Sequence, residues 1–183
     1  MKKLWEEFQY FFQQKIYVII LCLTAICGYG FEMTHPSIGI DATAVSLYLE
    51  EGLEVVMGRW FIYLINKIFH LSDFSPFMME LIGVILLCIS ATLFCVLFRR
   101  IFGRKVGLTG YIIFSCIFIS NPIISEVYVY YYHDGVDIGY VFSALALICF
   151  WSGMDKWSGT RKSAIKYYLG SLICITVAIG CYE

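Results

Sequence analysis

The chain has 183 residues, of which 60% are hydrophobic, 18% aromatic and only 15% charged, and its mean hydropathy is +0.77. A soluble domain is about 45–50% apolar and about 25% charged, so this composition excludes a water-soluble globular domain and also a disordered chain. The formal charge of −1, from 13 basic and 14 acidic residues, indicates no nucleic-acid partner. The composition therefore predicts an integral membrane protein.

A helix that crosses a bilayer needs about 20 mostly apolar residues. Five segments reach or approach this length: 16–31, 76–98, 106–119, 138–154 and 167–183. They predict an all-α polytopic membrane protein, built as a single transmembrane domain over 1–183. Before the first span, aromatic residues recur at helical spacing and predict an interfacial helix over 1–15: Trp5, Phe8, Phe11 and Phe12. The fifth segment meets Glu183 without a loop or a basic anchor, so we expect the N-terminal part of a longer chain.

The basic residues are distributed unevenly among the loops. Eleven of the 13 precede the first span or lie within 99–105 and 156–166, and the other two are Arg59 and Lys67. The positive-inside rule places the eleven, and the N-terminus, in the cytoplasm of a bacterial-type plasma membrane, and it turns the loops 32–75 and 120–137 outward. Segment 60–71, WFIYLINKIFHL, is too short to cross and predicts an interfacial or re-entrant helix. Ser75 before Pro76 predicts an N-cap that opens the second span.

In the first outer loop, apolar residues recur every three or four positions from Val45 to Trp60, which predicts an amphipathic helix on the membrane surface. Asp41 precedes this helix and is either its N-cap or a general base held at the membrane face. Arg59, between Gly58 and Trp60, is either a snorkelling arginine or a guanidinium that binds an anionic phosphate.

The second outer loop combines four tyrosines with ionisable residues: Glu126, His133, Asp134 and Asp137. They form either an aromatic belt with solvated acids or a platform that binds carbohydrate. A metal site of Glu126, Asp134 and Asp137 is a third interpretation, with an unspecific spacing. The sequence requires no cofactor and leaves a divalent metal unassigned. The eight cysteines lie in apolar stretches without CxxC spacing, so we expect them to pack as small hydrophobic residues rather than form a zinc site or disulfides.

The order of HPSIGID, GRW, a short apolar helix, NPIISE and HD resembles the membrane glucosyltransferases that use polyprenyl-phosphate-linked glucose, the type II glucosyl transferase family with a GT-C-like fold. The resemblance spans almost the whole chain and about the N-terminal third of a family member. It implies that Asp41 is the catalytic group and that Gly58, Arg59 and Trp60 bind the donor phosphate. The Asn-Pro element with its later acids maps onto the following residues: Asn121, Pro122, Glu126 and Asp134, where Glu126, Asp134 and the adjacent His133 would contact the sugar or the acceptor.

The implied function is transfer of glucose or a related hexose from a polyprenyl-phosphate donor to a cell-envelope glycan at the outer membrane face. Two alternatives stay open. A transporter or flippase for a lipid-linked or polar solute would place ionisable residues inside the spans, where Glu80 is the nearest candidate. A non-catalytic membrane scaffold would explain the tyrosines and the interfacial helices.

Overall fold

The computed structural model describes residues 2–35, 53–56, 58–70, 75–127, 134–157 and 161–181. Across these ranges the chain forms α-helices and one 3-10 turn, without a strand. The elements in chain order are α1 (Lys2–Gln13), α2 (Lys15–Thr34), α4 (Leu53–Val56), α5 (Trp60–Phe69), α6 (Pro76–Phe102), η2 (Gly103–Lys105), α7 (Leu108–Ile119), α8 (Pro122–Val127), α9 (Asp134–Trp157) and α10 (Arg161–Cys181). The predicted all-α polytopic membrane fold is confirmed.

Four helices are long and apolar enough to cross a membrane: α2, α6, α9 and α10. They correspond to four of the five predicted spans. The segment predicted over 106–119 forms α7, whose 12 residues extend only about 18 Å, against a hydrocarbon core of about 30 Å. The chain breaks after α7 because Asn121 caps a new helix: its Oδ1 accepts a hydrogen bond from the Ile123 N–H at 3.1 Å, and Pro122 begins α8.

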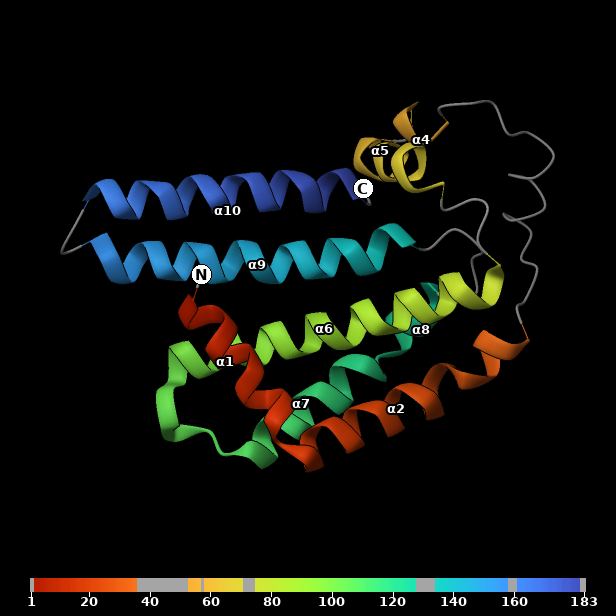
Figure 1. Cartoon of the computed structure of the whole chain (residues 1–183), viewed down its shortest axis with the longest axis horizontal. Coiled ribbons are helices and arrows are strands. Elements are labelled where there is room, and N and C mark those ends of the chain that lie inside the picture. Colours follow the sequence, from red (N-terminus) through yellow and green to blue (C-terminus); the bar gives the residue numbers. More distant parts are fainter. Residues whose placement is uncertain are drawn as a thin grey trace.

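The long helices form two packed groups (Figure 1). Helices α9 and α10 lie antiparallel and close together. Helix α6 packs against α9, and α2 and α7 cover the side of α6 that faces away from α9. Small residues permit the close approach of α9 and α10: a Cβ on Gly153 would lie 2.8 Å from the Tyr168 ring, and the Ser171 hydroxyl donates to the Ala146 carbonyl at 2.8 Å. Such small-residue contacts and interhelical hydrogen bonds are typical of helix association in membranes.

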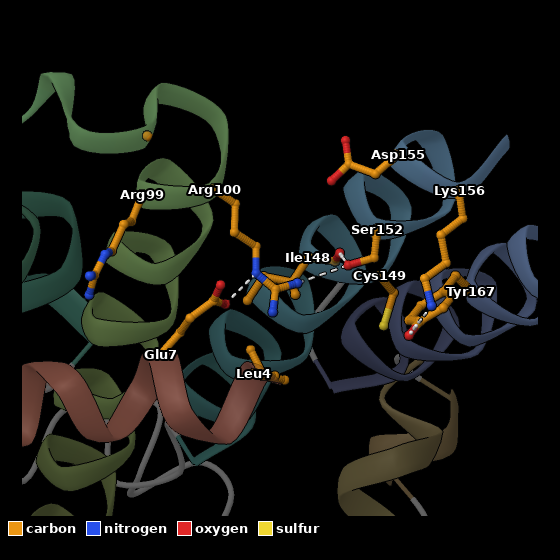
Figure 2. Close-up of a pocket in the computed structure, with 11 residues that line it drawn as sticks. Leu4, Glu7, Arg99, Arg100, Ile148, Cys149, Ser152, Asp155, Lys156 and Tyr167 are labelled. Atoms are coloured by element: carbon orange, nitrogen blue, oxygen red, sulfur yellow. Dashed lines mark hydrogen bonds and ion pairs between the residues drawn. The ribbon is translucent and has the colours of Figure 1, made fainter. Parts of the chain in front are cut away.

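The bundle has two chemically different ends, at the left and right of Figure 1. The basic end comprises α1, the end of α6, η2, the end of α9 and the start of α10, which together carry most of the basic residues. There Arg100 pairs with Glu7 at 2.5 Å and also donates to the Ser152 hydroxyl at 2.8 Å (Figure 2). The α5 end comprises the end of α2, α5, the starts of α6 and α9, α8 and the end of α10.

The predicted interfacial helix over 1–15 is α1, and its two sides meet different surroundings. On one side, Trp5 is 60% exposed, and the position of this helix at the membrane surface stays a prediction. Phe11 is fully buried and packs against Tyr17 and Tyr111, with ring centroids 5.2 and 5.3 Å away. Helix α1 is therefore also part of the packed bundle.

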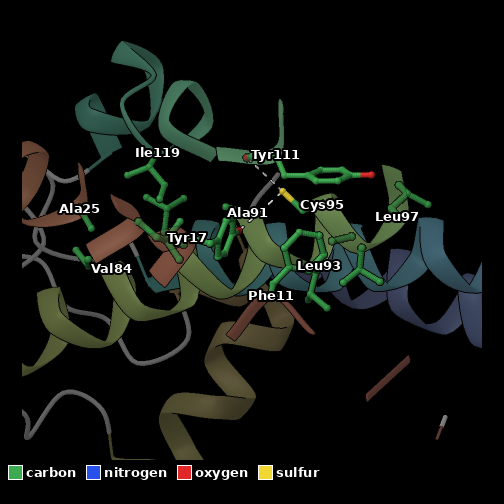
Figure 3. Close-up of a cluster of buried hydrophobic side chains, with 14 of the residues drawn as sticks. Phe11, Tyr17, Ala25, Val84, Ala91, Leu93, Cys95, Leu97, Tyr111 and Ile119 are labelled. Carbon is green, nitrogen blue, oxygen red and sulfur yellow. Dashed lines mark hydrogen bonds between the residues drawn. The ribbon is translucent and has the colours of Figure 1, made fainter. Parts of the chain in front are cut away.

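Helices α2, α6 and α7 share an apolar core (Figure 3), and a polar cluster joins the three helices inside it. The buried Tyr17 hydroxyl lies 3.1 Å from Thr92 Oγ1 and 3.0 Å from Ser115 Oγ, and Ser115 also contacts the Cys95 thiol at 3.3 Å. Because a polar group in an apolar interior is costly unless it is hydrogen-bonded, these contacts specify how the three helices pack. All eight cysteines are free thiols in the structure.

Candidate functional site

The first-loop part of the predicted site lies mostly outside the described residues. Asp41 lies outside the described residues, as does most of the predicted amphipathic helix, of which α4 is described, and His133 of the second loop also lies outside them. Glu126 falls in α8 and Asp134 is the first residue of α9, so the backbone positions of both belong to the α5 end. The predicted outer loop over 120–137 therefore contains α8 and the first turn of α9.

The Gly58-Arg59-Trp60 element forms the turn that begins α5. Gly58 has φ 83°, in the left-handed region that only glycine adopts without strain, and its N–H donates to the Val55 carbonyl at 3.1 Å. The Trp60 N–H donates to the Gly58 carbonyl at 2.9 Å, and the helix begins with the Tyr63 N–H, which donates to the Arg59 carbonyl at 3.2 Å. Glycine is thus required at this position by the backbone alone.

Trp60 and its neighbours attach α5 to α9 and α10. A Cβ on Gly180 would come within 2.8 Å of Trp60 Cζ2 and closer still to Nε1, so the indole lies directly against the α10 backbone. Phe61 packs edge-on against Phe142 of α9, with ring centroids 5.7 Å apart. The GRW element is therefore held against the hairpin that α9 and α10 form.

Arg59 is the N-cap residue of α5 and is half-buried, with its Nε atom fully enclosed. Its backbone adjoins the N-terminus of a 10-residue helix, where the orphan N–H groups and the helix dipole favour negative charge. A guanidinium beside such a terminus is suited to hold a phosphate or another anion.

The sequence analysis grouped Asp137 with the acids of an outer loop, but the structure places it inside α9, where it is fully buried. Its electrostatic neighbours include Tyr29, Tyr140 and Cys88, and Cys88 lies near the middle of α6. The Tyr29 hydroxyl donates to the Ile119 carbonyl at the end of α7. A signal was present in DGVDIGY, because the glycines on either side of the aspartate mark close helix packing.

Two further observations concern the charged residues. Glu80, in the second turn of α6, is 6% exposed and is the other buried carboxylate among the residues whose side chains the structure describes. No group of three His, Cys, Asp or Glu side chains close enough to hold a metal ion occurs within the described ranges.

These features define the class: a helical polytopic membrane protein whose GRW turn packs against α9 and α10. Comparison with known families adds the identity. A family model described as glucosyl transferase GtrII matches residues 30–183, and the chain belongs to this family. The family supports a glycosyltransferase that uses a sugar donor and an acceptor. Neither a search of curated proteins nor a search of solved structures finds a match.

Proposed function

We propose that the protein transfers glucose, or a related hexose, from a polyprenyl-phosphate donor to a cell-envelope glycan at the outer membrane face. The observation that carries this proposal is the GtrII family match, whose range includes every candidate residue. It is supported by the fold, in which GRW, α8 and the start of α9 belong to one end of the bundle. In the proposed orientation the basic end is cytoplasmic, as the positive-inside rule requires.

In the proposed mechanism, a hydroxyl oxygen of the acceptor attacks the anomeric carbon of the donor sugar and the bond from this carbon to the phosphate oxygen breaks. Asp41 takes the hydroxyl proton as general base. Arg59 stabilises the negative charge that develops on the departing polyprenyl phosphate. In-line attack inverts the configuration at the anomeric carbon, and the released lipid phosphate stays in the bilayer.

The other candidate residues have supporting roles in this proposal. Gly58 and Trp60 hold Arg59 at the donor phosphate, consistent with the turn and the indole packing described above. Glu126, Asp134 and His133 would accept hydrogen bonds from, or donate them to, hydroxyls of the sugar or the acceptor. The reaction needs no cofactor in this form, and a divalent ion is left to experiment.

The test measures transfer of labelled glucose by the full chain in proteoliposomes that contain the polyprenyl-phosphate-glucose donor and an envelope glycan acceptor. We expect Asp41→Asn to lower the rate about 100-fold or more, as for loss of a general base. Arg59→Gln should lower it about 100-fold, in the range measured for loss of a donor to a developing oxyanion. Lys67→Gln is the matched control, because Lys67 is an exposed cation on the same helix.

Each role has its own contradictory result. If Asp41→Asn transfers glucose at the parental rate, Asp41 is not the base. If Arg59→Gln and Lys67→Gln behave alike, Arg59 contributes only charge at the membrane surface. Chelation with EDTA in the same assay shows whether a divalent ion takes part.

The transporter alternative has one observation in its favour, the buried Asp137 beside Cys88 in the middle of α6. Intramembrane carboxylates are typical of solute and proton pathways. A transporter would move the labelled lipid or sugar across the bilayer without forming a glycoside, and Arg59→Gln would leave that flux intact. A scaffold would show neither activity.

A further inference from the structure

Helix α5 carries one half-buried polar side chain that its packing does not explain. All side chains of α5 except Asn66 and Lys67 are apolar or aromatic. Lys67 is exposed, and its Nζ lies 5.8 Å from the centre of the Tyr63 ring one turn earlier. Asn66 is half-buried instead, and its Oδ1 is enclosed without a hydrogen-bond donor among the described residues. A buried amide oxygen without a partner is costly, so packing alone gives no reason for an asparagine at this position.

Asn66 lies on the same side of α5 as Arg59. Seven residues are about two turns of an α-helix and return to within about 20° of the starting direction, so the two residues share one line along the helix. Between them, Ile62 is buried against the first turn of α9, where a Cβ on Gly135 would lie 2.9 Å from Ile62 Cγ1. The line of Arg59 and Asn66 therefore borders the packed side of α5, beside the start of α9.

This placement puts a neutral hydrogen-bonding group beside the proposed phosphate site. In the proposed reaction Arg59 holds the donor phosphate, and the hexose is covalently attached to that phosphate. The amide oxygen of Asn66 can accept hydrogen bonds from hydroxyl groups. Asp134, the first residue of α9, precedes Gly135, so the backbone of a second candidate acceptor lies on this side of α5. A sugar next to Arg59 would supply the donor that the Asn66 oxygen lacks, whereas an apolar ligand would leave this oxygen without a partner.

We propose that Asn66 is a specificity-determining residue that accepts a hydrogen bond from a hydroxyl of the transferred hexose. In this assignment Arg59 recognises the phosphate of the donor lipid, and Asn66 recognises its sugar. The terminal torsion of an asparagine side chain is broad, so a modest rotation turns Oδ1 from the helix surface toward the sugar. The inference rests on the proposed function, because it assumes that the donor phosphate lies at Arg59.

The experiment measures equilibrium binding of two lipids to the purified full chain by native mass spectrometry: polyprenyl-phosphate-glucose and polyprenyl methyl phosphate. Both are phosphate diesters of the same charge, and only the first carries a sugar. We expect the parent chain to prefer the glucose lipid. Asn66→Leu should reduce this preference about fivefold, which corresponds to about 1 kcal/mol for one hydrogen bond between neutral groups. Arg59→Gln should weaken the binding of both lipids alike, because both present the same phosphate.

Two further variants and one stability measurement separate this role from others. Asn66→Asp should keep the preference for the glucose lipid, because a carboxylate oxygen also accepts a hydrogen bond from a hydroxyl. Lys67→Gln is the matched control, since it changes the neighbouring exposed side chain of the same helix, and it should keep the preference as well. In thermal unfolding without lipid, Asn66→Leu should have a Tm equal to or above that of the parent, because it removes a buried acceptor that has no partner in the described part of the chain.

The proposal is overturned if the parent binds the two lipids equally, if Asn66→Leu keeps the preference, or if Lys67→Gln loses it to the same extent. A clear fall in the Tm of Asn66→Leu would also overturn it, since the amide would then hold the protein's own structure. Transfer of labelled glucose is measured on the same samples. A chain that shows the Asn66-dependent preference but transfers no glucose keeps the hexose site and loses the proposed function. A chain that transfers glucose while Asn66→Leu keeps the preference loses only the assignment of Asn66.

Discussion

The contact between Gly180 and Trp60 gives a stringent test of how α5 is attached to the bundle. A Cβ on Gly180 would come within 2.8 Å of Trp60 Cζ2, a separation that packed atoms do not tolerate, so Gly180→Ala must displace the indole or separate α5 from α10. Overpacking of this kind costs about 1–3 kcal/mol. For a chain of this size each kcal/mol lowers Tm by about 2–4 °C, so we expect a decrease of about 2–12 °C.

Gly170→Ala is the matched control for this variant. Gly170 lies on the same helix, and its added Cβ would meet only the Cys149 Sγ, at 3.8 Å, which is an ordinary contact. Alanine also favours the helical state over glycine by about 1 kcal/mol, so Gly170→Ala should leave Tm unchanged or raise it. The assay is thermal unfolding in detergent, with the transfer rate measured on the same samples.

A second substitution identifies the cause of the loss. Trp60→Leu removes the ring that the new methyl group would meet, so the cost of Gly180→Ala should be much smaller in the Trp60→Leu background. The reasoning is refuted if Gly180→Ala is as stable as Gly170→Ala. It is also refuted if the effects of Gly180→Ala and Trp60→Leu simply add.

Three further predictions concern other parts of the bundle. Tyr17→Phe removes three interhelical hydrogen bonds from the core, to Thr92, Cys95 and Ser115, and should lower the free energy of unfolding by about 1–2 kcal/mol. Denaturation in mixed micelles measures this, and an unchanged stability would contradict the role of the polar cluster. Arg100→Gln breaks a half-buried ion pair and should lower the free energy of unfolding by about 1.5–3 kcal/mol. Adding Glu7→Gln to this variant should lower it by less than Glu7→Gln does alone, and strictly additive losses would argue against coupling of the two residues. An impermeant amine reagent applied to sealed cells should modify Lys67 and no lysine of the basic end, and the reverse pattern would invert the proposed orientation.

Local rules were sufficient where a feature depends on a few adjacent residues. Ser75 and Pro76 were predicted to open the second span, and the Ser75 hydroxyl accepts a hydrogen bond from the Met78 N–H at 3.4 Å while Pro76 begins α6. The short apolar segment at 60–71 was predicted as a helix and forms α5. Both outcomes follow from capping chemistry and helix length, which do not require knowledge of the remaining fold.

Prediction was weaker where tertiary packing decides the outcome. In the sequence, Asp137 is an acid beside a polar loop. Only the packing of α9 against its neighbouring helices makes this side chain fully buried. Likewise, the apolar stretch that contains α7 has the hydropathy of a span, but the Asn121 cap divides it into two short helices. In the first outer loop, Asp41 stays a prediction from the sequence and from the family resemblance.

The GRW element combines a structural and a proposed chemical role, and this determines which of its residues can report on catalysis. Gly58 is required by its positive φ, and Trp60 by its contact with α10, so a loss of transfer on substituting either residue has a structural explanation. Arg59 lies between them, and its backbone conformation, φ −83°, is available to any residue. Arg59→Lys keeps the positive charge but removes the planar fork of donors. Transfer that falls in Arg59→Lys without a change in Tm would therefore assign the phosphate contact to the guanidinium itself.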